Sequence, residues 1–315
     1  MNSEAESMLW VAKYRPRTVQ ECILPDRLKK PFQGHVDKKF IPNLVLSGKS
    51  GVGKTTIAMA MCEELGMDYI MINASNESGI DTLRVKIRGY ASSVSLTGGR
   101  KVIIVDEADG LSKASQMAFR GVIEEFEDNC SFIFTCNYKN MLVGANLSRT
   151  ANIEFKLKKE EKAKMASLFM KRVCEILDLE KVTYDPKVIV EVIKKYFPDY
   201  RRILNELQSY SSIGQIDSGI LAANNNLQAK DLIKIIANKD FSAARKWVSE
   251  NTDVDAELVY RDVYDNLNTI LKKESVPAAV LLLAKYQYQA AFVADQEINM
   301  LAFLTELMIE TEAAE

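Results

Sequence analysis

The stretch Gly48-Lys-Ser-Gly-Val-Gly-Lys-Thr55 limits the possible folds more than any other part of this chain. It matches the pattern GxxxxGK[ST], follows the apolar run Leu44–Ser47 and overlaps the start of a helical pattern over Lys54–Glu64. Glycines at these positions allow a tight loop whose backbone N–H groups point at phosphate oxygens, and the helix N-terminus adds a partial positive charge. The sequence therefore predicts a phosphate-binding loop (P-loop) between a strand and a helix.

Further apolar runs alternate with helical patterns as far as Phe155. We predict strands at Leu44–Ser47, Tyr69–Asn73, Val102–Asp106, Phe132–Cys136 and Ile153–Phe155, and helices at Lys54–Glu64, Ile80–Ser93 and Lys113–Glu125. The strand runs lack strict alternation, which is typical of strands buried on both faces in a parallel sheet between helices. This pattern predicts a doubly wound α/β P-loop domain that binds its ligand at the carboxyl ends of the strands.

From about Lys158 the strand pattern is absent and helical spacing dominates. The sequence Phe197-Pro-Asp199 interrupts the pattern, and Asp199 is placed to cap a predicted helix over Tyr200–Tyr210. The segment 211–228 is rich in Ser, Gly and Asn and is expected to form a hinge or loop. We therefore expect three parts: an α/β nucleotide-binding domain over 1–156, a helical lid domain over 157–228 and an all-α domain over 229–315.

The overall composition limits the partners and the compartment. A formal net charge of −2 lacks the basic excess of a dedicated DNA-binding domain, so any nucleic-acid contact needs a local basic patch. The apolar runs fall short of the roughly 20 residues that a membrane span needs. The five cysteines form no CxxC pair, which indicates neither a zinc module nor a disulfide framework. We expect a cytoplasmic protein without a membrane partner.

The P-loop residue types point to ATP and magnesium. The residues expected to bind the nucleotide phosphates are Gly48, Ser50, Gly51, Val52, Gly53, Lys54, Thr55 and Thr56. Lys54 can reach the β- and γ-phosphates, and the Thr55 hydroxyl can ligate Mg²⁺. Asp106 ends an apolar strand and is the second predicted magnesium residue. Glu107 follows it and is placed to polarise the attacking water, which predicts an ATP hydrolase.

These motifs together resemble the AAA+ ATPases, which assemble into rings or spirals, and within that class the clamp loader subunits. The resemblance is closest to the large (ATPase) subunits of the sliding-clamp loaders of T-even-like bacteriophages. The strings Glu21-Cys-Ile-Leu-Pro25 and Phe197-Pro-Asp-Tyr-Arg201 carry it, and it covers nearly the whole chain, most vaguely beyond Asp231. The resemblance implies that ATP binding assembles several copies and an accessory subunit into a spiral that opens the sliding clamp. Primer–template DNA then triggers hydrolysis and release of the loaded clamp.

Two stretches resemble residues of this class that sense the nucleotide. In Thr135-Cys-Asn137, Asn137 resembles the first sensor, an amide that orients the lytic water. The stretch Pro198-Asp-Tyr-Arg-Arg-Ile-Leu-Asn205 resembles the second sensor, in which Arg201 contacts the γ-phosphate from the lid. Here Phe197-Pro198 replaces the small residue that usually precedes the Asp. The resemblance adds Asn137 and Arg201 to Lys54 and Glu107 as catalytic residues.

Two more motifs are typical of clamp loaders. Leu147-Ser-Arg149 resembles their SRC motif, whose arginine reaches into the ATP site of the neighbouring subunit, although Thr150 stands where that motif has Cys. Lys13-Tyr-Arg-Pro16 matches the box that lines the adenine pocket. The resemblance therefore implies that Arg149 acts in catalysis between subunits and that Tyr14, Arg15 and Pro16 bind the nucleotide.

The resemblance also implies contacts outside the ATP site. Arg84 and Arg88 share one face of the helix predicted over Ile80–Ser93 and are expected to neutralise DNA phosphates without reading sequence. Gln116 and Arg120 are expected to couple DNA contact to Glu107 and to link neighbouring ATP sites. In the same helix Met117 and Phe119 are candidates for clamp contact, but core packing explains either of them better. The C-terminal helices resemble the collar that holds the loader subunits together.

Two other functions remain open from the sequence. One is a different AAA+ DNA-handling motor, such as a helicase loader or a branch-migration motor, although a branch-migration motor is expected to end in a winged domain with strands. The other is a scaffold subunit locked to its nucleotide, which would require loss of function at Lys54, Glu107 or Arg149. All three of those residues are present.

Overall fold

The computed structural model divides the chain into two compact units, 1–217 and 218–315. The structure describes residues 9–74, 80–95, 99–142, 150–212, 214–217, 226–251, 256–290 and 292–313. Within these ranges no helix is both long and apolar enough to span a membrane. The helical segment expected after residue 228 begins slightly earlier, since α12 starts at Asn226. The division into lid and collar domains at residue 228 stays a prediction.

The first unit contains a five-stranded parallel sheet. Its strands are β1 (Leu44–Ser47), β2 (Tyr69–Asn73), β3 (Lys101–Asp106), β4 (Cys130–Cys136) and β5 (Ala151–Glu154). They lie in the order β2-β3-β4-β1-β5, and every neighbouring pair is parallel. The five predicted strands and their parallel arrangement are confirmed. Every residue of β1 and of β4 is buried, which explains why neither strand alternates between apolar and polar residues.

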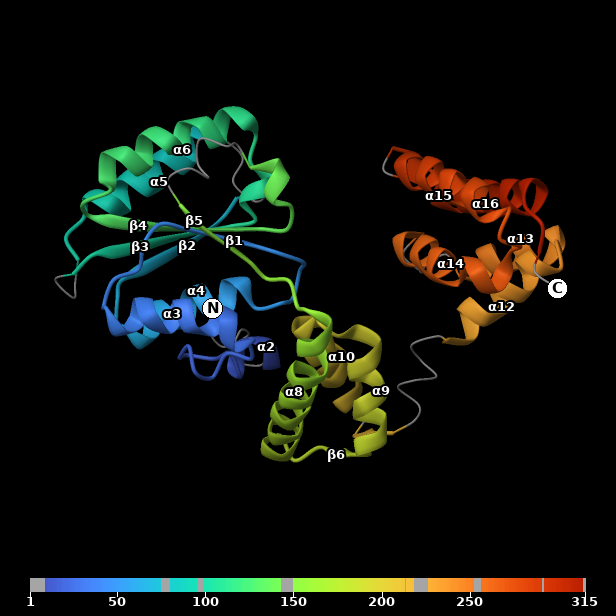
Figure 1. Cartoon of the computed structure of the whole chain (residues 1–315), viewed down its shortest axis with the longest axis horizontal. Helices are drawn as coiled ribbons and strands as arrows, with labels where there is room; N and C mark the ends of the chain where they lie inside the picture. Colours follow the sequence, from blue (N-terminus) through green and yellow to red (C-terminus); the bar gives the residue numbers. More distant parts are fainter. Residues whose placement is uncertain are drawn as a thin grey trace. The chain divides into compact units, whose positions relative to one another are not determined.

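Helices cover both faces of this sheet (Figure 1). On one face lie α3 (Asp26–Asp37) and α4 (Lys54–Glu64), and on the other α5 (Ile80–Ser92) and α6 (Lys113–Phe126). Alternate strand residues feed the two cores: Leu44 and Leu46 pack on the side of α3 and α4, whereas Val45 packs on the side of α5 and α6. The Ser112 side chain caps α6 by accepting a hydrogen bond from the N–H of Ser115.

The lid follows the sheet as three helices, α8 (Lys159–Leu179), α9 (Pro186–Tyr196) and α10 (Tyr200–Ser211). Asp199 caps α10 as predicted, because its Oδ1 accepts a hydrogen bond from the N–H of Arg202 at 2.9 Å. One expectation was wrong: β6 (Thr183–Tyr184) and β7 (Gln215–Ile216) form a small parallel pair after Lys158. Strands of two residues are too short to show a periodic sequence pattern.

The described residues of the second unit form helices, with one isolated antiparallel bridge between Leu271 and Ala313. Its helices are α12 (Asn226–Ala237), α13 (Phe241–Glu250), α14 (Ala256–Ile270), α15 (Val276–Ala290) and α16 (Gln296–Glu310). Leu267, Leu283, Phe303 and Leu304 belong to its apolar core. The buried Asn299 amide is satisfied there, since its Nδ2 donates to the Tyr260 hydroxyl at 2.9 Å. This unit therefore has a core of its own and meets the expectation of an all-α C-terminal part.

Candidate nucleotide site

The P-loop joins β1 to α4 in a backbone conformation that suits glycine. Positive φ angles occur at Gly48 (150°), Gly51 (71°) and Gly53 (93°). The N–H of Gly48 donates to the carbonyl of Cys136 at 3.1 Å, which fixes the start of the loop against the end of β4. The predicted loop of three glycines between a strand and a helix is confirmed as a structure.

The lid contacts this loop directly at Gly51. The carbonyl of Gly51 accepts a hydrogen bond from the N–H of Tyr200 at 3.0 Å. A Cβ atom placed on Gly51 would lie 1.7 Å from Oδ1 of Asp199, the same oxygen that caps α10. The close fit between P-loop and lid therefore requires the absence of a side chain at position 51.

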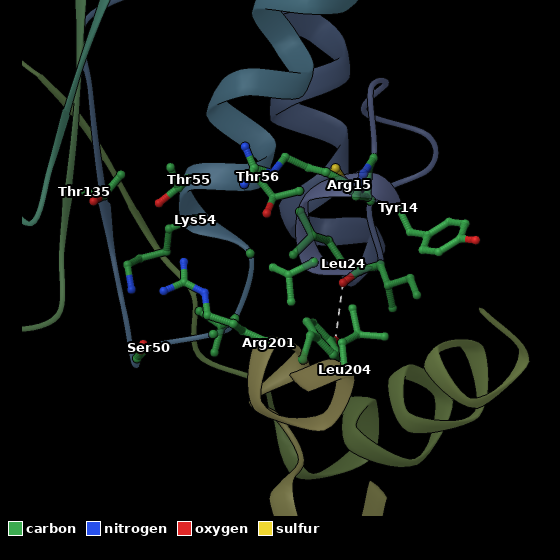
Figure 2. Close-up of a pocket in the computed structure, with 18 of the residues that line it drawn as sticks. Tyr14, Arg15, Leu24, Ser50, Lys54, Thr55, Thr56, Thr135, Arg201 and Leu204 are labelled. Atoms are coloured by element: carbon green, nitrogen blue, oxygen red, sulfur yellow. Dashed lines mark hydrogen bonds between the residues drawn. The ribbon is translucent and has the colours of Figure 1, made fainter. Parts of the chain in front are cut away.

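Lys54 lies at the first turn of α4 and is only 8% exposed. Its Nζ donates to the carbonyls of Gly48 (2.7 Å) and Lys49 (2.8 Å) and to Oδ1 of Asn137 (3.0 Å). Burial lowers the pKa of Lys54, the carboxylate of Asp106 opposes that shift, and the Arg201 guanidinium adds to it. Figure 2 shows Arg201 reaching from the lid toward Lys54. Two cations from different domains thus lie at one end of the pocket.

Asp106 joins three elements at the end of β3. Its Oδ1 accepts hydrogen bonds from the hydroxyls of Thr55, at 2.7 Å, and of Thr135. The Thr55 hydroxyl and the Asp106 carboxylate are oxygen donors of the type that Mg²⁺ prefers, and they lie beside Lys54. The residues present therefore fit a magnesium ion at this edge of the sheet.

Glu107 adopts the left-handed conformation, with φ 56° and ψ 42°. Its N–H donates to the Thr135 hydroxyl at 3.1 Å, and its side chain is exposed within the pocket lining. Non-glycine residues rarely adopt this conformation, and it occurs often at functional sites. The turn after β3 therefore turns the Glu107 carboxylate away from the sheet core, where a water molecule has access to it.

Asp109 has a role that the sequence did not reveal. Its Oδ2 accepts hydrogen bonds from the N–H groups of Asn137, at 2.9 Å, and Tyr138, at 3.0 Å. The turn after β3 thereby holds the turn after β4. The side-chain amide of Asn137, which contacts Lys54, is positioned from the backbone side.

The pocket extends from the P-loop to the N-terminal segment and the lid (Figure 2). The predicted residues that line it are Tyr14, Arg15, Pro16, Ser50, Gly51, Val52, Gly53, Lys54, Thr55, Thr56, Asp106, Glu107, Asn137 and Arg201. The lining residues that sequence reasoning did not assign to the site are Val11, Glu21, Cys22, Ile23, Leu24, Met71, Thr135, Cys136, Phe169, Arg172, Ile176, Tyr200 and Leu204. Most of these are apolar, and only helical spacing marks those in α8, which any packed helix shares.

Among the other predicted residues that the structure describes, Gly48, Arg88 and Gln116 do not line this pocket. Arg88, on α5, pairs with Glu125 of α6 at 2.9 Å. Gln116 is 2% exposed, and its Nε2 donates to the carbonyls of Leu111 and Met141, each at 3.1 Å. The side chains of Arg84 and Arg120, and the whole of Arg149, lie outside the described residues.

Comparisons with known proteins agree with this geometry. The model of the ATPase family associated with various cellular activities (AAA) matches residues 44–158. A second model, the AAA+ ATPase lid domain of the sliding-clamp-loader large subunit, matches residues 161–222. A solved structure of the Thermotoga maritima RuvB Holliday junction branch migration motor is similar, with a TM-score of 0.53 over 70% of this chain and 79% of that one. Its 17% identity supports the fold alone. Fold and site therefore define an AAA-type ATPase, as predicted.

Curated relatives narrow the class. The sliding-clamp-loader large subunit of Escherichia phage RB69 is 38% identical over 240 residues, which cover 74% of each chain. The same subunit of Enterobacteria phage T4 is also 38% identical, over 74% of this chain and 75% of that one. The replication factor C small subunit of Sulfolobus acidocaldarius is 30% identical over 98% of each chain. This chain belongs to the family of sliding-clamp-loader ATPase subunits.

The contact between Gly51 and Asp199 leads to a first prediction. Gly51→Ala should weaken ATP binding at least tenfold and lower the free energy of unfolding by about 1–3 kcal/mol, because it adds strain at positive φ and displaces the cap of α10. The measurements are nucleotide titration and urea unfolding. Gly34→Ala is the matched control, since Gly34 lies in α3 with no atom within 4 Å of an added Cβ. Unchanged ATP affinity in Gly51→Ala would show that the lid does not need this fit.

Proposed function

We propose that this chain is the DNA-dependent motor subunit of a sliding-clamp loader. ATP binding assembles several copies with an accessory subunit into a spiral that opens the clamp and holds primer–template DNA, and hydrolysis releases the loaded clamp. The observation that carries this proposal is the contact between the P-loop and a lid of the clamp-loader type, through Gly51, Tyr200 and Arg201. Loss of the γ-phosphate changes this contact and thereby lets the lid rotate.

The P-loop residues bind the phosphates of ATP. The backbone N–H groups of the loop and the N-terminus of α4 contact the phosphate oxygens, and Lys54 contacts the β- and γ-phosphates. Lys54 Nζ donates to two loop carbonyls and to the side-chain amide of Asn137. These acceptors hold the ammonium group at this end of the pocket. Thr55 and Asp106 hold Mg²⁺, which neutralises phosphate charge when bound.

Glu107 and Asn137 position the attacking water. Glu107 polarises it as a general base, and the backbone conformation of Glu107 presents the carboxylate to the pocket. Asn137 connects this step to Lys54 through its side-chain amide. Arg201 contacts the γ-phosphate from the lid, and Arg149 completes the site of the neighbouring copy, where an arginine finger stabilises the charge of the transition state.

The far end of the pocket takes the adenine base. Tyr14 and Arg15 of the N-terminal segment lie at this end (Figure 2), and Pro16, Ile23 and Ile176 also belong to the pocket lining. Arg15 also contacts the α/β domain, because its Nη1 lies 3.2 Å from the Met59 sulfur on α4. Such a wall of apolar and planar groups suits a purine ring.

Contacts with DNA and clamp extend the site. Arg84 and Arg88 of α5 neutralise phosphates of the template strand. Gln116 couples this contact to Glu107: its bonds to the carbonyls of Leu111 and Met141 join the turns that follow β3 and β4. Arg120 of the same helix links neighbouring ATP sites.

The candidates for clamp contact separate clearly by burial. Met117 is 62% exposed on α6, whereas Phe119 is 3% exposed and packs edge-on against Phe134. We therefore assign Met117 to the clamp-facing surface and Phe119 to the core. The all-α second unit acts as the collar that joins subunits, and the loader works in the cytoplasm, in the host cell if a phage encodes the chain.

The proposal predicts how ATP hydrolysis responds to the partners. The steady-state ATPase rate should rise far more with primer–template DNA and the cognate sliding clamp together than with either alone. The measurement is the rate with each partner, with both and with neither. Stimulation by DNA with indifference to the clamp would contradict the proposal and favour a helicase loader or another DNA-handling motor.

A second prediction concerns the general base. Glu107→Gln should keep ATP binding within a few-fold of the wild type and reduce turnover by a factor of about 10²–10⁴, because the amide cannot accept a proton from water. Nucleotide titration and single-turnover hydrolysis measure the two quantities separately. Normal hydrolysis in this variant would refute the assignment. Glu124→Gln, an exposed position on α6, provides the control for the charge change.

A third prediction concerns the arginine supplied by a neighbour. Arg149→Ala should reduce the turnover of the assembled loader by a factor of about 10³ or more and leave ATP binding by the isolated chain unchanged. Adding increasing amounts of Lys54→Ala subunits, which carry an intact Arg149, should restore part of the activity. Failure of that mixture to recover any activity would argue against a role between subunits.

A further inference from the structure

The N-terminal segment, defined here as residues 10–16, is hydrogen-bonded to the lid at two places. The N–H of Trp10 donates to Oε1 of Gln208 on α10 at 2.9 Å, and α2 (Trp10–Lys13) packs against α10. Farther along, Nζ of Lys13 and the hydroxyl of Tyr14 both donate to Oε1 of Glu180, at 2.7 Å and 2.5 Å. The segment that precedes the α/β domain in sequence is therefore attached to the helices that follow that domain.

Glu180 is the C-cap residue of α8, and its spacing continues the row of α8 residues that line the pocket. Phe169, Arg172 and Ile176 line the pocket at intervals of three and four residues, and Glu180 follows Ile176 by four. The Glu180 side chain is 21% exposed, and the bonds from Lys13 and Tyr14 lower the pKa of its carboxyl group. Hydrogen bonds to an ionised acceptor are stronger than neutral ones, so the Glu180 carboxylate binds the N-terminal segment strongly.

The other side of the segment faces the nucleotide. Val11, Tyr14, Arg15 and Pro16 line the pocket, and Arg15 touches α4, the helix that begins at Lys54. Figure 2 shows that the Tyr14 ring points away from Lys54 and Thr55, so its hydroxyl is available to the lid rather than to the phosphates. The segment thus lies between the lid and the P-loop helix.

We propose that Glu180 is a positioning residue for nucleotide binding, which fixes the N-terminal segment to the lid through Tyr14 and Lys13. The lid then carries two parts of the pocket, Arg201 at the phosphate end and the wall of residues 11–16 at the base end. Lid rotation therefore opens both ends together, and the Glu180 contact sets how tightly the nucleotide is held. This inference rests on the ATP site of the proposed function.

The test is a double-mutant cycle in the full-length chain with Mg-ATP as the probe. Tyr14→Phe should raise the Kd for ATP about five- to tenfold, the effect of one charge-assisted hydrogen bond, and Glu180→Ala should raise it at least as much, because it removes the bonds from both Tyr14 and Lys13. The double variant should bind no more weakly than Glu180→Ala alone, because both substitutions remove the same contact. KM for ATP should rise in parallel while kcat at saturating ATP stays within about twofold, since neither residue touches the reacting phosphate.

Matched controls lie on the same lid. Glu191→Ala removes an exposed carboxylate on α9, and Tyr184→Phe removes a hydroxyl that bonds Asp178, and neither residue lines the pocket. Both should leave Kd and KM unchanged. Unchanged Kd in Glu180→Ala, additive losses in the cycle, or a fall in kcat without a rise in KM would each overturn the inference.

The ATP site itself is checked with Lys54→Ala. Loss of ATP binding in Lys54→Ala together with normal binding in Glu180→Ala would reject the inference and leave the proposed function intact. Normal ATP binding in Lys54→Ala would instead refute the proposed site, and the inference with it.

Discussion

The parallel pairing of β1 with β4 and β5 is the constraint on which the pocket depends. Ser47 lies opposite Cys136, so the P-loop leaves the sheet where β4 ends, and the N–H of Gly48 bonds the Cys136 carbonyl there. On the far side of β4, β3 ends at Asp106, whose carboxylate accepts hydrogen bonds from Thr55 of α4 and Thr135 of β4. The Lys54 ammonium group, the Asp106 carboxylate and the Asn137 amide, which come from segments far apart in sequence, therefore lie together at one edge of the sheet.

The lid completes this edge from outside the sheet. Its cap residue Asp199 lies where a side chain on Gly51 would lie, and the next residue, Tyr200, donates to the Gly51 carbonyl. The P-loop and the first residues of α10 therefore have to pack against each other in one arrangement. Glycine in such a loop usually lets the backbone approach a phosphate, and Gly51 also leaves room for the helix that carries Arg201. The position of the lid helices therefore depends on the same residue as the phosphate-binding loop.

The sequence predicted the features that local chemistry determines. The P-loop, the five strands and the Asp199 cap follow from glycine spacing, buried apolar runs and capping preference, and all three are confirmed. It could not predict that Asp109 holds the turn of Asn137 or that Glu180 binds Tyr14, because these partners meet only through tertiary packing. The strand pair β6–β7 was not predicted for another reason, since a strand of two residues shows no periodic pattern in the sequence. The catalytic and DNA-binding roles stay predictions.

For the DNA contact proposed at Arg88, the ion pair between Arg88 and Glu125 would change how the affinity depends on ionic strength. Both side chains are about half exposed, so the pair itself adds little stability. An arginine that already neutralises a carboxylate exchanges one anion for another when a phosphate arrives. When Arg88 pairs with a phosphate instead, the Glu125 carboxylate is left without its partner and attracts cations from solution. At the same time the phosphate releases the cations that were condensed on it. The net number of ions released is then smaller than the number of arginines at the interface, and the affinity falls less steeply with added salt than a count of basic residues suggests.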